Sequence, residues 1–173
     1  MSPELRRMLV EGDEVGFEKS FVNGDFPNSF SVDWRECDDD IVRYCAECLS
    51  ITSLEPDWKD DALFIRRGEK KTPVPLREDG GDRHITLCAL NDALAPDYEA
   101  RYLVVSGGSD TLGLVALRTN DWRKLEEACP QAVAENFIDP RLLPNLITEF
   151  TEKSLPIPAR ARYRRMVNRS QRS

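Results

Sequence analysis

The chain has 173 residues, of which 40% are hydrophobic and 32% are charged, and its formal net charge is −7. This length suits a single domain with a real hydrophobic core, and no apolar run reaches the roughly 18 residues that a membrane helix needs. Residues 1–152 hold 31 acidic and 17 basic side chains, a net of −14, whereas residues 153–173 hold seven basic side chains and no acidic one. The acidic body argues against a nucleic-acid surface, so nucleic acid is expected at most at the arginine-rich end.

The sequence favours a cytoplasmic location. The first twelve residues are too short and too charged to form a signal peptide. The cysteines are odd in number in a chain with an ample core, which is typical of free thiols in a reducing compartment. They are Cys37, Cys45, Cys48, Cys88 and Cys129. We therefore expect a cytoplasmic protein without a membrane span.

The N-terminal part predicts two helices separated by an irregular stretch. Residues 3–11 predict a short helix, with Pro3 in its first turn and Gly12 as its stop. Residues 13–32 predict irregular structure that contains four phenylalanines, Phe17, Phe21, Phe26 and Phe30. We interpret these aromatic side chains as a cover for one edge of the core, and the alternative is an exposed docking patch for a partner. Residues 36–50 then predict a helix from their apolar spacing.

A hairpin with a protected edge follows a polar link that contains Pro56. Its strands are predicted at Ala62–Arg67 and Lys71–Arg77. Pro73 and Pro75 lie two residues apart in the second strand, so both missing N–H donors face the same side. We therefore expect the second strand to lie at an edge that cannot accept a further strand.

The second half predicts a buried helix and another hairpin. Residues 82–95 are apolar on more than one side, which indicates a central helix. A hairpin is predicted from Tyr98–Ser106 and Thr111–Arg118, joined by a turn at 107–110. Its apolar residues do not alternate cleanly, as expected for inner strands covered on both faces. Further helical segments are predicted at 121–128 and 130–137, at one or two turns within 142–150, and at the basic end.

Together these elements predict an α+β fold in a single domain, residues 1–158, followed by a basic tail or frayed helix at 159–173. The expected order is helix, hairpin, helix, hairpin, helix, with an extra C-terminal helix. The two hairpins within residues 62–136 are expected to form one antiparallel sheet of about four strands, with the helices packed against it. This order of elements is similar to that of type III secretion chaperones, which are also small and acidic.

Candidate chemistry is confined to thiols and one histidine. Cys45 and Cys48 form a C-x-x-C pair, and His84 and Cys88 are four residues apart, so the four side chains together could form a Cys₃His zinc site. The C-x-x-C lies in an apolar helical stripe without glycine or turn residues, which favours buried free thiols. Any Ser-His or Cys-His mechanism would require His84, the only histidine. No catalytic signature is present, and we expect no catalytic residue, metal ligand or cofactor.

Acidic side chains are the candidate partner-binding residues. Asp38 and Asp39 fall in the first turn of the 36–50 helix, and Asp57, Asp60 and Asp61 follow it. Neither group has the spacing of a calcium loop. As solvated charges at a helix start and in a loop they need no ligand, whereas as a binding face they would steer the approach of a cationic protein.

The arginine-rich C-terminus also has two interpretations. Arg160, Arg162, Arg164, Arg165, Arg169 and Arg172 recur with a single interleaved aromatic residue, Tyr163. Such a segment could contact nucleic acid or an anionic membrane surface. We favour contact with the acidic body of the same chain, or a solubilising role, because the segment is short and poor in aromatic residues.

These patterns predict a non-catalytic protein-binding module of a bacterial-type cytoplasmic protein. An immunity-like inhibitor fits best, because its negative charge would mimic the anionic substrate of a toxin and speed its capture. One alternative is a secretion chaperone that holds an extended effector segment, and another is a small enzyme or zinc protein that uses His84 and the cysteines. The expected partner is a basic or neutral protein, and a homodimer is left open.

Overall fold

The computed structural model describes residues 3–33, 35–77, 82–107, 110–146 and 149–171, and it confirms the α+β class. The helices are α1 (Pro3–Glu11), α2 (Glu14–Val22), α3 (Asp38–Leu49), α4 (Asp82–Leu94), α5 (Thr119–Ala128), α6 (Pro130–Asn136) and α7 (Ile157–Ser170). The strands are β1 (Ser29–Asp33), β2 (Leu54–Lys59), β3 (Ala62–Arg67), β4 (Lys70–Pro73), β5 (Tyr98–Leu103), β6 (Thr111–Arg118) and β7 (Phe137–Ile138). Short 3-10 turns are η1 (Val104–Ser106), η2 (Pro140–Leu142) and η3 (Glu152–Ser154). The strands form two antiparallel sheets.

The larger sheet has the strand order β1-β6-β5-β7, so β6 and β5 lie inside it. Leu114 of β6 lies opposite Phe30 of β1 on one side and opposite Tyr102 of β5 on the other. Residues 112–117 of β6 are all buried because helices cover both faces of this sheet. The expectation that the second hairpin supplies inner strands is therefore confirmed.

Successive residues of β6 point into two separate apolar clusters, as the pleat of a strand requires. Leu112, Leu114 and Ala116 belong to the cluster that includes α3 and α4, whereas Val115 and Leu117 belong to the cluster that includes α1, α2, α5 and α6. Gly113 lies on the second face, beneath the ring of Phe21. A Cβ atom on this glycine would be 2.3 Å from the Phe21 ring, so α2 packs closely on the sheet only because a glycine is present there.

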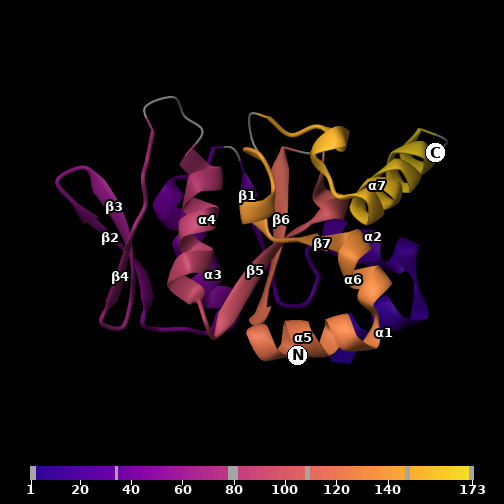
Figure 1. Ribbon diagram of the computed structural model, residues 1–173, viewed down its shortest axis with the longest axis horizontal. Helices are drawn as coiled ribbons and strands as arrows, with labels where there is room; N and C mark the ends of the chain where they lie inside the picture. Colours follow the sequence, from indigo (N-terminus) through magenta and orange to yellow (C-terminus); the bar gives the residue numbers. More distant parts are fainter. Residues whose placement is uncertain (1–2, 34, 78–81, 108–109, 147–148, 172–173) are drawn as a thin grey trace.

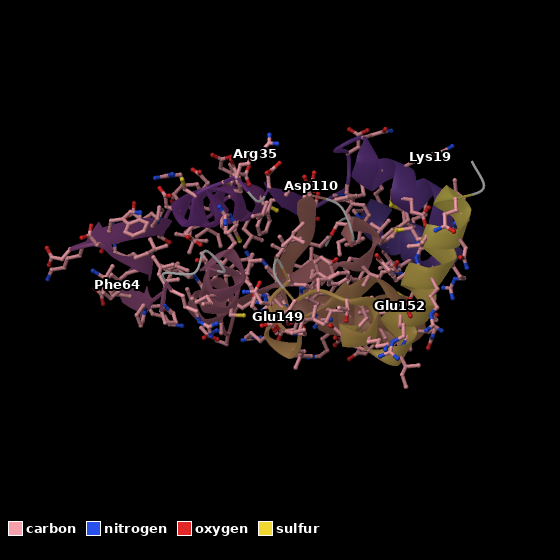
Figure 2. All side chains as sticks on the ribbon, turned by 90° about the horizontal axis from the view of Figure 1, so that it is seen from above. Lys19, Arg35, Phe64, Asp110, Glu149 and Glu152 are labelled. Carbon is pink, nitrogen blue, oxygen red and sulfur yellow. The ribbon has the colours of Figure 1, made fainter. Side chains whose placement is uncertain are left out.

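The smaller sheet has the strand order β2-β3-β4, and we call it the arm, residues 54–73. Leu63 and Ile65 on its inner face are fully buried, and they join α4 in the first apolar cluster. Phe64 lies between them in sequence and points to the outer face. Figure 1 shows the arm at one end of the molecule, and Figure 2 shows Phe64 on the arm at the opposite end from Lys19 and Glu152.

Helices α3 and α4 form the layer between the two sheets (Figure 1). Helix α4 contacts β3 and β4 on one side and β5 on the other, while α3 contacts β2 as well as β1 and β6. The prediction that both hairpins within residues 62–136 form one continuous sheet is therefore wrong. The connecting helix is apolar on more than one side, and it buries that surface by lying between the hairpins.

The prediction of irregular structure at 13–32 is also wrong, because this stretch contains α2 and β1. Asp13 caps α2, since its carboxylate accepts a hydrogen bond from the Gly16 amide at 2.8 Å. Phe17 and Phe26 are buried and lie edge to face with their ring centroids 4.7 Å apart. The interpretation of these aromatic side chains as part of the core is thus confirmed.

A third strand of the arm, β2, lies where a polar link was expected. Leu54, Pro56 and Trp58 alternate with polar residues, which is the period of a strand. The segment was nevertheless interpreted as a link, because a proline within it argues against a strand. With α2, β1 and β2 added, the order helix, hairpin, helix, hairpin, helix no longer holds, and the similarity to type III secretion chaperones that rested on it does not hold either.

The remaining predicted boundaries are close to the observed ones. The helices expected at 3–11, 36–50, 82–95, 121–128 and 130–137 are confirmed to within two residues. Strand β4 ends at Pro73 and β5 ends at Leu103, both earlier than expected. Of the predicted turn at 107–110, residues 108–109 lie outside the described part of the chain.

Prolines close one edge of the arm at β4. The Val74 amide donates to the Leu63 carbonyl at 2.9 Å, so every second residue of this segment faces β3. Pro73 and Pro75 alternate with Val74 and therefore face away from β3, as expected from the sequence. A strand that approached this edge would find no N–H donor at either position.

The opposite edge of the arm is closed in the same way at β2. The Gly68 amide donates to the Ser53 carbonyl at 3.0 Å, which sets the alternation of the β2–β3 ladder. Pro56 then falls among the residues whose backbone faces away from β3. Both edges of the described arm are therefore poor templates for a further strand, which disfavours self-association by strand addition at these edges.

Replacing all three prolines should remove this protection. We expect the triple variant Pro56→Val/Pro73→Val/Pro75→Val to fold but to self-associate as its concentration rises, because valine restores N–H donors and favours strands. Light scattering coupled to size exclusion would detect the higher mass. Pro130→Ala, a proline of α6 outside the arm, is the matched control. A triple variant with the mass of the wild type at every concentration would contradict the edge argument.

Helix α7 is bound to the body through a buried arginine. Arg162 is 1% exposed, and its guanidinium donates to Asn136 Oδ1 of α6 at 3.0 Å and to Glu18 Oε1 of α2 at 2.9 Å. Arg169 donates to the same Glu18 oxygen at 2.6 Å. Arg164 and Arg165 pair with Glu152 and Glu135. Within the described residues, the basic C-terminal segment is thus a helix, and Arg162, Arg164, Arg165 and Arg169 contact acidic side chains of the same chain.

Removing the buried guanidinium should destabilise the fold. We expect Arg162→Met to lower the free energy of unfolding by about 3 kcal/mol, because Asn136 and Glu18 lose a desolvated partner. Arg164→Met, at a position where the side chain is 62% exposed, should cost less than about 1 kcal/mol. Urea denaturation followed by circular dichroism measures both. Equal costs for the two variants would show that Arg162 does not hold α7 in place.

Candidate protein-binding site

The turn between β2 and β3 presents two adjacent carboxylates on a strained backbone. Asp60 and Asp61 have φ angles of 48° and 64°, in the left-handed region. Two such residues form the two-residue hairpin turn that normally has Asn-Gly or Asp-Gly. Both side chains are exposed, and neither forms a hydrogen bond or an ion pair with a described residue. The turn therefore holds two charges at the tip of the arm.

An exposed aromatic side chain lies beside these carboxylates. Trp58 is 49% exposed, which is unusual for a residue that buries well elsewhere in proteins. It lies opposite Leu63 near the end of the β2–β3 ladder. The sequence interpretation had missed Trp58 because the whole segment was assigned to a polar link. The alternation of Leu54, Pro56 and Trp58 was the signal that could have found it.

Asp57 lies on the outer face of the arm and already has a partner. Its carboxylate forms an ion pair with the Lys71 ammonium at 2.8 Å. The same ammonium lies 4.2 Å from the centroid of the Phe64 ring, a cation–π contact. Arg66 and Glu55 form a second ion pair on this face. The outer face is therefore a small aromatic patch with balanced charges, and the unpaired carboxylates lie at the tip.

The other two predicted residues, Asp38 and Asp39, belong to the first turn of α3 and have local roles. Asp38 accepts a hydrogen bond from Thr86 Oγ1 at 2.6 Å, which connects α3 to α4. Asp39 forms an ion pair with Arg43 at 2.6 Å. Cys37, Asp39 and Asp40 have ligand atoms within 4.8 Å of one another, but exposed acidic groups at a helix start are explained by the helix dipole. The five predicted aspartates thus lie on two separate elements.

A groove of about 580 Å³ runs between α3 and the free edge of β2. We call its apolar lining residues the floor; they are Ala46, Ile51, Leu54 and Pro56. We call its polar lining residues the rim; they are Arg43, Glu47, Ser50, Thr52 and Glu55. Because β2 continues from this groove to Trp58 and the Asp60–Asp61 turn, the groove and the tip lie along one strand.

The thiols and the histidine do not gather into a zinc site. Among the described residues, the only group of three or more metal-ligand atoms within 4.8 Å of one another is the one that contains Cys37, so Cys45, Cys48, His84 and Cys88 do not converge. His84 Nε2 lies 3.7 Å from the Cys88 sulfur. Burial lowers the pKa of His84 and raises the pKa of Cys88 to about 11, so both groups are neutral at pH 7. A neutral thiol beside a neutral imidazole is a weak nucleophile.

The C-x-x-C pair is also unsuited to redox chemistry. Cys45 is fully buried, and burial raises its pKa well above the usual value. Burial raises the pKa of Cys48 to about 11. All five cysteines are free thiols. These two side chains fit the interpretation as small apolar groups on the buried side of α3.

Comparisons with known proteins do not identify a function for this site. No protein-family model matches the chain, and no curated protein or solved structure has significant similarity to it. No helix in the described ranges is long and apolar enough to cross a membrane.

Thiol reactivity tests this account of the cysteines. At pH 8 a thiol with a pKa near 11 is about one part in a thousand thiolate, so we expect the exposed Cys37 to react rapidly with Ellman's reagent while Cys45, Cys48 and Cys88 react slowly. The fast phase should disappear in Cys37→Ser and remain in Cys48→Ser. A fast phase that depends on Cys48, or a Cys45–Cys48 disulfide under mild oxidation, would contradict the structural role of the pair.

Proposed function

We propose that this protein is a non-catalytic binding module that contacts a basic or neutral partner protein through the tip of the arm, as an immunity-like inhibitor of a toxin would. The observation that carries the proposal is the combination of Trp58, half exposed, with the unpaired carboxylates of Asp60 and Asp61 on one hairpin. Aromatic anchors beside charged groups are typical of the residues that dominate binding energy at protein interfaces.

The backbone of the tip supports a role beyond folding. A residue other than glycine in the left-handed region costs stability, although aspartate tolerates it better than most. Glycine at position 61 would form the same turn more easily. Backbone strain that is retained at an exposed position is a reason to infer a function for the side chain. Here, two adjacent carboxylates would increase the association rate with a cationic partner.

The geometry weighs against the two alternatives. A chaperone that held an extended segment by strand addition would need a free sheet edge, and Pro56, Pro73 and Pro75 disfavour this at both edges of the arm. An enzyme that used His84 with Cys88 would need an ionised thiolate, which the raised pKa of Cys88 disfavours. The free thiols are consistent with a proposed cytoplasmic location.

The proposal is tested with the products of the genes adjacent to the one that encodes this chain. We expect one of them to inhibit growth when expressed alone, to be neutralised by this protein and to bind it in calorimetry. Asp60→Asn/Asp61→Asn should weaken that binding at least about tenfold and reduce its salt dependence, because asparagine keeps the turn but removes both charges. Trp58→Ala should weaken it by a similar factor.

The matched control is Asp25→Asn/Glu127→Gln, which removes two exposed carboxylates outside the arm. This variant should bind nearly as well as the wild type. An equal loss of binding affinity in the control and in the tip variant would show that the effect depends only on net charge. Full binding by both tip variants would exclude the tip as the interface, and a lack of any complex with the neighbouring products would contradict the immunity-like role.

A further inference from the structure

We propose that the groove between α3 and β2 receives an arginine or lysine side chain of the partner protein, a step that rests on the proposed binding role of the arm. The groove lies along the same strand that leads to Trp58 and the tip. A partner that contacted the tip and extended along β2 would reach the groove.

The backbone of β2 offers acceptors to this groove but almost no donors. Leu54 and Pro56 lie in the phase of the strand that faces away from β3, so their carbonyl groups point to the free edge. The Leu54 amide already donates to the Ile51 carbonyl at 3.3 Å, and Pro56 has no N–H. A strand would need both donors and acceptors along this edge, whereas a guanidinium or ammonium group needs acceptors alone.

The charges on the rim favour the same occupant. The cation of the groove, Arg43, is held by Asp39 at 2.6 Å and by Asp40 at 2.9 Å. The rim carboxylate of Glu55 pairs with Arg66. The exposed carboxylate of Glu47 forms no hydrogen bond or ion pair with a described residue. The groove therefore presents one uncompensated negative charge above an apolar floor.

This arrangement suits an amphipathic basic side chain. The aliphatic stem of an arginine or lysine can lie on Ala46, Ile51 and Leu54 while its charged end reaches the Glu47 carboxylate. Arginine is favoured over lysine, because its planar group can donate to a carboxylate and to a carbonyl at the same time. An acidic side chain would meet Glu47 and the outward carbonyls and would be repelled.

The test uses isotope-labelled full-length protein and blocked dipeptides, followed by amide chemical shifts. Acetyl-Leu-Arg-amide should shift the amides of Ala46, Ile51 and Leu54 in a saturable way. Acetyl-Leu-citrulline-amide, which keeps the shape but lacks the charge, should bind about fivefold more weakly. Acetyl-Leu-Glu-amide should not shift these amides.

Two matched variants locate the charge that is recognised. Glu47→Gln should weaken the arginine peptide to the level of the citrulline peptide, while Glu69→Gln, an exposed carboxylate on the β3–β4 turn, should leave it unchanged. Equal binding of the arginine and citrulline peptides, or shifts confined to other surfaces, would overturn the inference. Because no partner protein is used, a negative result here is separate from a failure of the tip variants in the partner assay.

Discussion

The structure depends on the burial of α4 on more than one side. A helix with apolar residues on a single face can lie on the surface of a sheet, but Leu87, Leu90 and Leu94 of α4 are all buried, together with Ala89 and Ala93. The chain satisfies this requirement by placing one hairpin on each side of the helix, with α3 beside it. One apolar cluster then extends from the arm through α4 to the larger sheet.

Separation of the hairpins has consequences for the surface. A three-stranded sheet that stands apart from the larger one has two edges, and each must be protected from a further strand. Pro56 protects one edge and Pro73 with Pro75 the other, so the proposed partner contacts are placed at the tip and at the groove beside α3 and not along the arm's edges. Pro56 also leaves the β2 edge with outward carbonyl groups and fewer donors, which is the basis for the proposed binding of a cationic side chain there.

The net charge of the chain is a poor guide to where a partner would bind. Many carboxylates are used within the fold: Asp38 connects two helices, Asp39 holds Arg43, and Glu18 receives two arginines of α7. Among the described carboxylates that form no ion pair or hydrogen bond, Asp60 and Asp61 at the tip and Glu47 on the rim of the groove are the ones proposed to contact a partner. The position of such groups matters more for what the surface can attract than the net charge of −7.

The sequence predicted local structure well and the relation between distant elements less well. Pro73 and Pro75 predicted an edge strand because the missing donors are a local property, and the helix at 82–95 was recognised as central from its apolar spacing. The two sheets were not predicted, because the same spacing does not say whether a buried helix lies on one sheet or between two. Strand β2 was not predicted because it contains Pro56, and Trp58 was therefore not identified as a candidate site residue. Of the candidate site, Asp60 and Asp61 were identified from charge alone, whereas the groove exists only when α3 and β2 are placed side by side.

The central claim is that α4 is a shared core element of both sheets, and native-state hydrogen exchange on Leu90→Ala tests it most directly. Loss of this fully buried side chain should lower stability by about 2–5 kcal/mol. The account predicts the same loss of protection at the amide of Ile65 in β3 and at the amide of Leu114 in β6. Loss of protection in one sheet with the other unchanged would contradict it, because the two sheets would then be stabilised independently.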